Sequence, residues 1–199
     1  RDFSSTIDVL SCTQGFEVKR LDKNSWQVLN NGQACTIEYK VYCFILGVRH
    51  SYVDQYMAFL HGVSVFGYVN GLEDLPVEVA VQNGVYKQCE VALPVEKGVY
   101  RAKNYDHLAD SPFALGSFDM VEYHSHGVLH KVVMVGTGNY NLEQIKTDFK
   151  KISDVEGEMF GEIPVSPHYI HFIQNVSTGS GGLEHANCQT SQMERNAYS

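Results

Sequence analysis

Short runs of β-forming residues, each ended by a turn signal, fill the first hundred positions and restrict what this chain can fold into. Residues 16–22 alternate apolar and polar side chains, and residues 26–30 lead into a turn at Asn31 and Gly32. Similar runs follow at residues 34–46, 63–69, 77–81 and 87–93. Strands at such short, even spacing predict a β-sandwich or a related sheet domain. Residues 52–62 are ambiguous between a helical turn and a loop.

The pattern of polar and apolar residues changes near Asn104. A polar connector begins there and is interrupted by Pro112, and the residues after it mix strand and helix patterns. We therefore predict two domains, a β domain at residues 1–103 and a second domain at residues 104–199. The whole chain is expected to be α+β and mostly β, with one or two helices.

The clearest helix pattern follows a predicted hairpin that turns at residues 125–127. Asn141 and Gln144 have the spacing of a helix N-cap. The apolar residues that follow fall on one helical face: Leu142, Ile145, Phe149 and Ile152. Ser153 and Glu156 repeat the cap pattern and predict a second short helix. A strand is expected next, at residues 168–176, followed by a Gly-rich turn.

Composition excludes several classes of protein. The 199-residue chain has a formal net charge of −8, which disfavours a nucleic-acid binder, because such proteins need a clustered basic face. The longest apolar run, at residues 41–48, is far too short to span a membrane. No pair of the five cysteines has the CxxC spacing of a zinc ribbon or a thioredoxin. We expect reduced thiols, and a Cys35–Cys43 or Cys12–Cys89 disulfide is the alternative in an oxidising compartment.

Histidine is abundant, with nine in the chain. His124, His126 and His130 form an H-x-H-x3-H pattern that two strands of a hairpin could bring together as a metal site. Only Glu122 is near enough in sequence to complete a ligand set, so we expect solvated hairpin histidines instead. The sequence therefore predicts no metal site and no catalytic residue in this chain.

The sequence GSGGLEHANC, at residues 179–188, combines two glycines with an adjacent acid and imidazole. A strand here could lie at a sheet edge, where an extended peptide would pair with its backbone and Glu184 would bind a free amino group. The alternative is a surface glutamate beside a packing histidine. Cys188 and His185 would need a helix to meet as nucleophile and base, so we expect an inert thiol.

The chain contains, in this order, the segments RDFSSTI, FEVKRLDKNSWQV, YKVYCFILGVRHSYVD, NYDHLADSPF, FGEIP, YIHFI and GSGGLEH. Together these segments resemble the glycyl aminopeptidase family of zinc metallopeptidases. These enzymes are thermolysin-like and usually carry a PDZ domain as well. The resemblance covers essentially the whole chain. The family keeps a hydroxyl residue shortly after the Gly-Gly-Leu-Glu-His motif, whereas here Cys188 follows Asn187, and Thr190 or Ser191 could take its place.

The resemblance implies a thermolysin-like catalytic domain from residue 104 onward and an aminopeptidase that acts on peptides. By analogy, the substrate would be bound by Gly181, Gly182, Leu183, Glu184 and His185. Zinc would be the cofactor of the full-length parent protein, held by a His-Glu-x-x-His motif. No histidine in this chain is followed by glutamate. We therefore expect an inactive fragment without zinc, cut before the ligand helix.

The residues alone leave a second function open. A non-catalytic β-sandwich module that binds peptide or carbohydrate would also fit the predicted strands. The oligomeric state, the preferred N-terminal residue, the presence of a PDZ domain and the cellular compartment stay open. The compartment could be the cytoplasm, the bacterial periplasm or the extracellular space.

Overall fold

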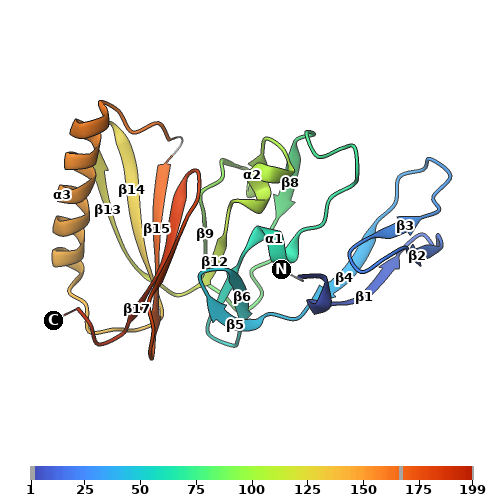
Figure 1. The fold of residues 1–199 in the computed structure, drawn as a ribbon, viewed down its shortest axis with the longest axis horizontal. Coiled ribbons are helices and arrows are strands. Elements are labelled where there is room, and N and C mark those ends of the chain that lie inside the picture. Colours follow the sequence, from blue (N-terminus) through green and yellow to red (C-terminus); the bar gives the residue numbers. More distant parts are fainter. Residues whose placement is uncertain (1–2, 166–167, 199) are drawn as a thin grey trace.

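The computed structural model describes residues 3–165 and 168–198, and they form a mostly β, α+β fold, as predicted. A 3-10 turn, η1 (Phe3–Thr6), precedes two small antiparallel ribbons. The first ribbon pairs β1 (Ile7–Cys12) with β4 (Ile37–Val41), and the second pairs β2 (Val18–Arg20) with β3 (Trp26–Val28). Both ribbons lie at one end of the elongated molecule (Figure 1).

Two larger sheets and a three-stranded sheet make up the rest of the described chain. The central sheet has the order β5 (Phe44–Gly47), β6 (His50–Val53), β7 (Ala58–Leu60), β12 (Phe113–Gly116), β9 (Gln88–Val91). The three-stranded sheet has the order β10 (Val95–Glu96), β11 (Val99–Ala102), β8 (Val77–Ala80). It packs on the central sheet through apolar side chains of both, in the manner of a small sandwich. The helices α1 (Gly62–Val65) and α2 (Tyr105–Ala109) lie beside these sheets (Figure 1).

The C-terminal sheet is mixed and carries the long helix on one face (Figure 1). Its order is β13 (Asp119–Ser125), β14 (Val128–Val135), β15 (His168–Val176), β17 (Cys188–Glu194), β16 (Gly181–Glu184). The helix α3 (Leu142–Phe160) connects the parallel strands β14 and β15. The predicted hairpin at β13 and β14 is confirmed, and β17 is a strand that the sequence pattern did not predict.

The prediction of a second short helix that starts at Ser153 is wrong, because α3 continues through this residue as one helix. Asn141 is its N-cap and accepts hydrogen bonds from the backbone of Glu143 and Gln144, as predicted. Ser153 does not cap a second helix, since its hydroxyl is buried against Tyr123 of β13. The buried face continues from Phe149 through Ser153 and Gly157, whereas Ile152 is 54% exposed. Spacing at i+4 keeps these positions on one face and leaves Ile152 outside it.

The prediction of a strand at residues 63–69 is also wrong. The segment begins as α1 and then continues without regular structure. A Cβ atom at Gly62 would lie 2.5 Å from the carbonyl oxygen of Leu108, so the turn packs tightly on α2. This contact with a distant segment overrides the local β propensity of the valines. The ambiguous residues 52–62 contain strand β7.

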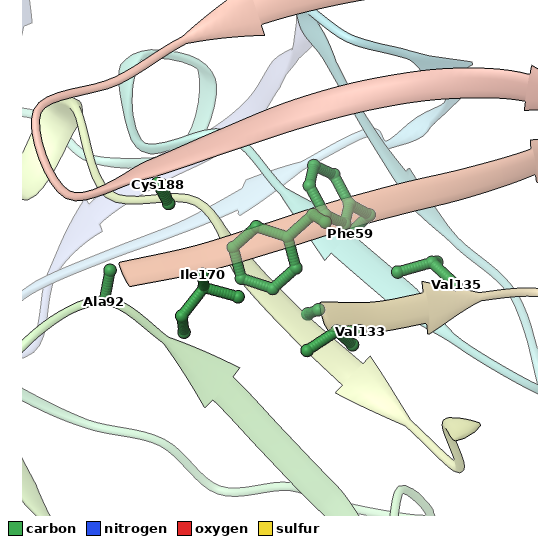
Figure 2. Packing of buried hydrophobic residues seen from close by; sticks show 8 residues of the cluster. Phe59, Ala92, Val133, Val135, Ile170 and Cys188 are labelled. Atoms are coloured by element: carbon green, nitrogen blue, oxygen red, sulfur yellow. The ribbon is translucent and has the colours of Figure 1, made fainter. Parts of the chain in front are cut away.

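One hydrophobic core joins the central sheet to the C-terminal sheet. Phe59 of β7 is completely buried and its ring meets that of Phe172 of β15 edge-on, with 5.5 Å between centroids. Figure 2 shows Phe59 among side chains of both sheets, including Ala92, Val133 and Ile170. The predicted connector lies inside this arrangement, because it forms α2 and leads into β12 between β7 and β9. The chain changes sheet after β12, and the division at residues 103 and 104 stays a prediction.

Candidate functional site

The glycine pair of the GSGGLEH motif lies on an edge strand. β16 pairs on one side with β17, in the register Gly182 to Ser191 and Glu184 to Gln189, and is last in its sheet. A Cβ atom at Gly182 would meet nothing within 4 Å, so the strand is open above this residue. At Gly181 the corresponding position lies 3.5 Å from a methyl group of Val48. An extended chain could therefore approach the strand most closely at Gly182.

A carboxylate from a distant segment fixes the end of this strand. Asp110 is the C-cap of α2, and its Oδ1 lies 2.8 Å from Nδ1 of His185. The backbone N–H of Ala186 donates to the other oxygen of the same carboxylate, also at 2.8 Å. Desolvation would raise the pKa of Asp110, but the hydrogen bonds from His185 and Ala186 outweigh it and lower that pKa. Asp110 is thus an anionic acceptor that joins α2 to β16.

His61 lies behind His185 and is almost completely buried. The two imidazole centroids are 5.8 Å apart, with the rings tilted by 32°. Burial lowers the pKa of His61 to about 4, and the nearby His185 and His50 add to this effect. His61 is therefore neutral at physiological pH. Nε2 of His61 and Nε2 of His185 are both buried and have no hydrogen-bond partner.

These groups line one open pocket of about 670 Å³. Its wall carries one cationic and three acidic side chains together with the two histidines and three apolar residues. The residues are Arg49, His61, Val63, Asp106, Ala109, Asp110, Leu183, Glu184 and His185. Glu184 lines the pocket and is exposed to solvent. The arrangement presents a free strand edge beside an acidic pocket, which suits an extended ligand with a positively charged end.

The structure brings the predicted residues Leu183, Glu184 and His185 together with groups that the sequence pattern missed, whereas Gly181 and Gly182 lie on the same strand but do not line the pocket. Asp110 was part of a recognised motif, but nothing in its local sequence indicated His185 as its partner. His61 and Arg49 come from segments without any site signal. Their place in the pocket depends on how β6, β7 and α2 pack, which spacing along the chain does not reveal.

The histidine pattern at the hairpin is divided by the fold. His124 is exposed on β13, and His126 lies in the turn with a φ of 47° and its Nε2 3.1 Å from the carbonyl oxygen of Asp154. His130 is buried on the helix-facing side, where its Nδ1 lies 3.2 Å from Nε2 of His171. Within residues 3–165 and 168–198, no three His, Cys, Asp or Glu side chains come together as metal ligands.

A buried polar cluster underlies α3. The hydroxyl of Tyr123 lies 3.0 Å from that of Ser153 and 3.1 Å from Nε2 of His171. Burial, with a smaller contribution from the neighbouring His130, lowers the pKa of His171 to about 3. These groups are remote from the edge strand in the sheet, and their contacts join the helix to β13, β14 and β15.

The cysteines are all free thiols. Cys188 is completely buried at the start of β17, and its desolvation raises the pKa of the thiol well above the usual value. His185 contacts it through the backbone, where the N–H of His185 donates to the carbonyl of Cys188 at 2.9 Å. A protonated, buried thiol is a poor nucleophile.

Residues 1–117 match the model of the peptidase M61 N-terminal domain. The chain belongs to this family. The M61 match ends just after β12, where the chain leaves the central sheet. The resemblance to metallopeptidases is thus supported at the level of the M61 family. A search of curated proteins found no match.

Solved structures extend the likeness beyond the M61 domain to the whole chain. An aminopeptidase N family protein from Idiomarina loihiensis matches with a TM-score of 0.93 and 31% identity. The match covers 100% of this chain and 36% of that protein, so this chain spans about a third of its length. Yeast LTA4 hydrolase matches with a TM-score of 0.52 at 13% identity, over 94% of this chain and 33% of that one, and shares the fold alone. None of the helices in the described part of the chain is long and apolar enough to cross a bilayer.

Proposed function

We propose that this chain supplies the N-terminal domain and the substrate-binding strand of a zinc-dependent aminopeptidase. The observation that carries the proposal is the position of Gly181–Glu184 as a free sheet edge beside an acidic pocket. The M61 match and the Idiomarina loihiensis aminopeptidase N family protein support the peptidase class. Within that class we assign the chain to the glycyl aminopeptidases, thermolysin-like enzymes with an accompanying PDZ domain, on the motifs named above.

The backbone of β16 would bind the substrate as an added antiparallel strand. Gly182 has no side chain, so the substrate main chain can reach the N–H and C=O groups of the edge. Leu183 and His185 would shape the wall beneath the first substrate residue. Glu184 would bind the free amino group of the peptide, which favours removal of single residues over cleavage within the chain.

The residues described here do not fit a zinc ion, because no three ligands of suitable type converge. We assign no zinc ligand to these residues. The His-Glu-x-x-His motif of the family that the chain resembles would supply the ligands, and the bound metal would act as a Lewis acid on the scissile carbonyl. No step of the proposed binding depends on it. The part of the reaction that this chain would perform is the alignment of the peptide and the capture of its amino terminus.

The proposal is tested by Glu184→Gln in the full-length enzyme. Loss of a charge-assisted hydrogen bond of roughly 1.5–3 kcal/mol should lower kcat/KM on free-amino peptides by about one to two decades. Amino-blocked substrates of the same sequence should change far less. Glu158→Gln on α3 is the control, since that side chain is exposed and lies on the helix outside the pocket. An equal fall on both substrates would mean that Glu184 does not bind the amine.

A further inference from the structure

The hydrogen bond between Asp110 and His185 determines where the proton of the imidazole lies. The lowered pKa of Asp110 keeps its carboxylate ionised, and an ionised carboxylate can only accept hydrogen bonds. Its Oδ1 is 2.8 Å from Nδ1 of His185, so Nδ1 must carry the hydrogen. In its neutral form, with the hydrogen on Nδ1, His185 presents a lone pair at Nε2. The second oxygen of Asp110 accepts from Ala186, which holds the carboxylate in this orientation.

The lone pair at Nε2 of His185 has no donor within the protein. The side chain is 5% exposed and lines the same pocket as Glu184. A buried acceptor without a partner is destabilising, and such atoms in native proteins are usually satisfied by a ligand or by water. Nε2 of the neighbouring His61 is unpaired as well, and this ring is uncharged, so it does not repel a cation.

The charges of the pocket indicate what kind of donor fits. Asp106, Asp110 and Glu184 face one cation, Arg49, which leaves the wall negative while the histidines are neutral. A primary ammonium group carries three N–H donors and no acceptor. It can donate to a carboxylate and to an imidazole lone pair at the same time, whereas a carbonyl or carboxylate ligand would face two acceptors.

We propose that Nε2 of His185 is a second acceptor for the ammonium group of the ligand, beside the carboxylate of Glu184, and that Asp110 is the positioning residue that fixes the required tautomer. The inference rests on the proposed function, in which that ammonium is the amino terminus of a peptide. Asp110 touches no substrate atom in this scheme. It acts through the imidazole, as a carboxylate does when it orients a catalytic histidine.

Asp110→Asn should change the tautomer of His185, while the shape of the side chain at position 110 changes little. The asparagine Oδ1 can still accept from Ala186, while its amide donates to Nδ1 of His185 and moves the ring proton to Nε2. Asp106→Asn is the matched control, because it removes a charge from the same pocket wall without a contact to His185. Long-range proton–nitrogen NMR spectra of this chain read the tautomer directly. We expect a protonated Nδ1 in the wild type and in Asp106→Asn, and a protonated Nε2 in Asp110→Asn.

Kinetics of the full-length enzyme test the role of the lone pair. Asp110→Asn should raise KM for free-amino peptides by about 10- to 100-fold, with a smaller effect on kcat and on amino-blocked substrates. A wild-type tautomer protonated at Nε2, or an equal loss on free and blocked substrates, overturns the inference. A wild-type enzyme without aminopeptidase activity would instead refute the proposed function, and the NMR spectra would still decide the tautomer.

Discussion

Acidification from pH 7 to pH 5 should destabilise this chain because two of its histidines are buried in the neutral form. The pKa of His61 is lowered to about 4 and that of His171 to about 3, mainly by burial. In the unfolded chain both would titrate near the ordinary value of about 6.5. Below that pH the unfolded state binds more protons than the folded state, so stability falls as the pH decreases.

The size of the effect follows from the unfolded pKa. At pH 5 both rings are still neutral in the folded chain. In the unfolded chain this pH lies about 1.5 units below the pKa of each ring. At about 1.36 kcal/mol per unit this gives about 2 kcal/mol per histidine, or about 4 kcal/mol for the pair. The lowered pKa values of His107, His130 and His168 act in the same direction. The carboxylates with lowered pKa values contribute only nearer pH 4 and below.

Urea unfolding at pH 7, 6 and 5 measures this dependence. His171→Phe removes one titrating group, so the loss of stability between pH 7 and pH 5 should shrink by about 2 kcal/mol, whatever the variant's stability at pH 7. His124→Gln is the control, because this side chain is exposed on β13 and should leave the loss unchanged. A wild-type stability that is constant over this range, or an unchanged loss in His171→Phe, would refute the reasoning.

Two further substitutions test the packing and the helix start. Gly62→Ala should destabilise the chain by about 1–3 kcal/mol, because its Cβ would lie 2.5 Å from a backbone oxygen of α2, whereas Gly67→Ala has nothing within 4 Å. Urea unfolding of the two variants checks this, and equal stabilities would contradict it. Asn141→Ala should cost about 1 kcal/mol, since the N–H groups of Glu143 and Gln144 lose their acceptor. A thermal midpoint identical to that of the wild type would show that the cap contributes nothing.

The sequence predicted elements well where a local pattern coincides with the tertiary environment. Asn141 caps α3 because its side chain satisfies N–H groups within its own turn, and no distant contact is needed. The hairpin at residues 125–127 is equally local, with Gly127 at a φ of 80°. The edge position of β16 could also be anticipated from its glycine pair. Glycine weakens a strand and often marks a place where another backbone approaches closely.

Elements that depend on long-range packing could not be predicted. The chain at Gly62 is helical and not extended because α2 packs against it, and the local pattern of valines does not indicate that contact. Ile152 matched the helical face by sequence but lies outside it, since the buried stripe passes through the small residues Ser153 and Gly157. A hydrophobicity pattern gives little weight to such residues, although they let the helix approach the sheet.

The pairing of Asp110 with His185 shows the same limit for the site. The two residues are 75 positions apart and meet because β12 joins the central sheet while β16 ends the other. Sequence spacing anticipated the edge strand, and the role of Glu184 on it stays a prediction. The spacing did not identify the group that orients the imidazole, because that group belongs to a helix on the other side of the shared core.

The open edge of β16 also has a consequence for solubility. A strand with unpaired backbone groups is a template on which a second copy of the chain could add and begin an aggregate. Here the exposed strand is only four residues long, two of them are glycines with low β propensity, and its last residue is the anionic Glu184. Parallel, in-register self-association would place two such carboxylates side by side. The features that would admit a peptide with a cationic end thus discourage pairing between identical molecules.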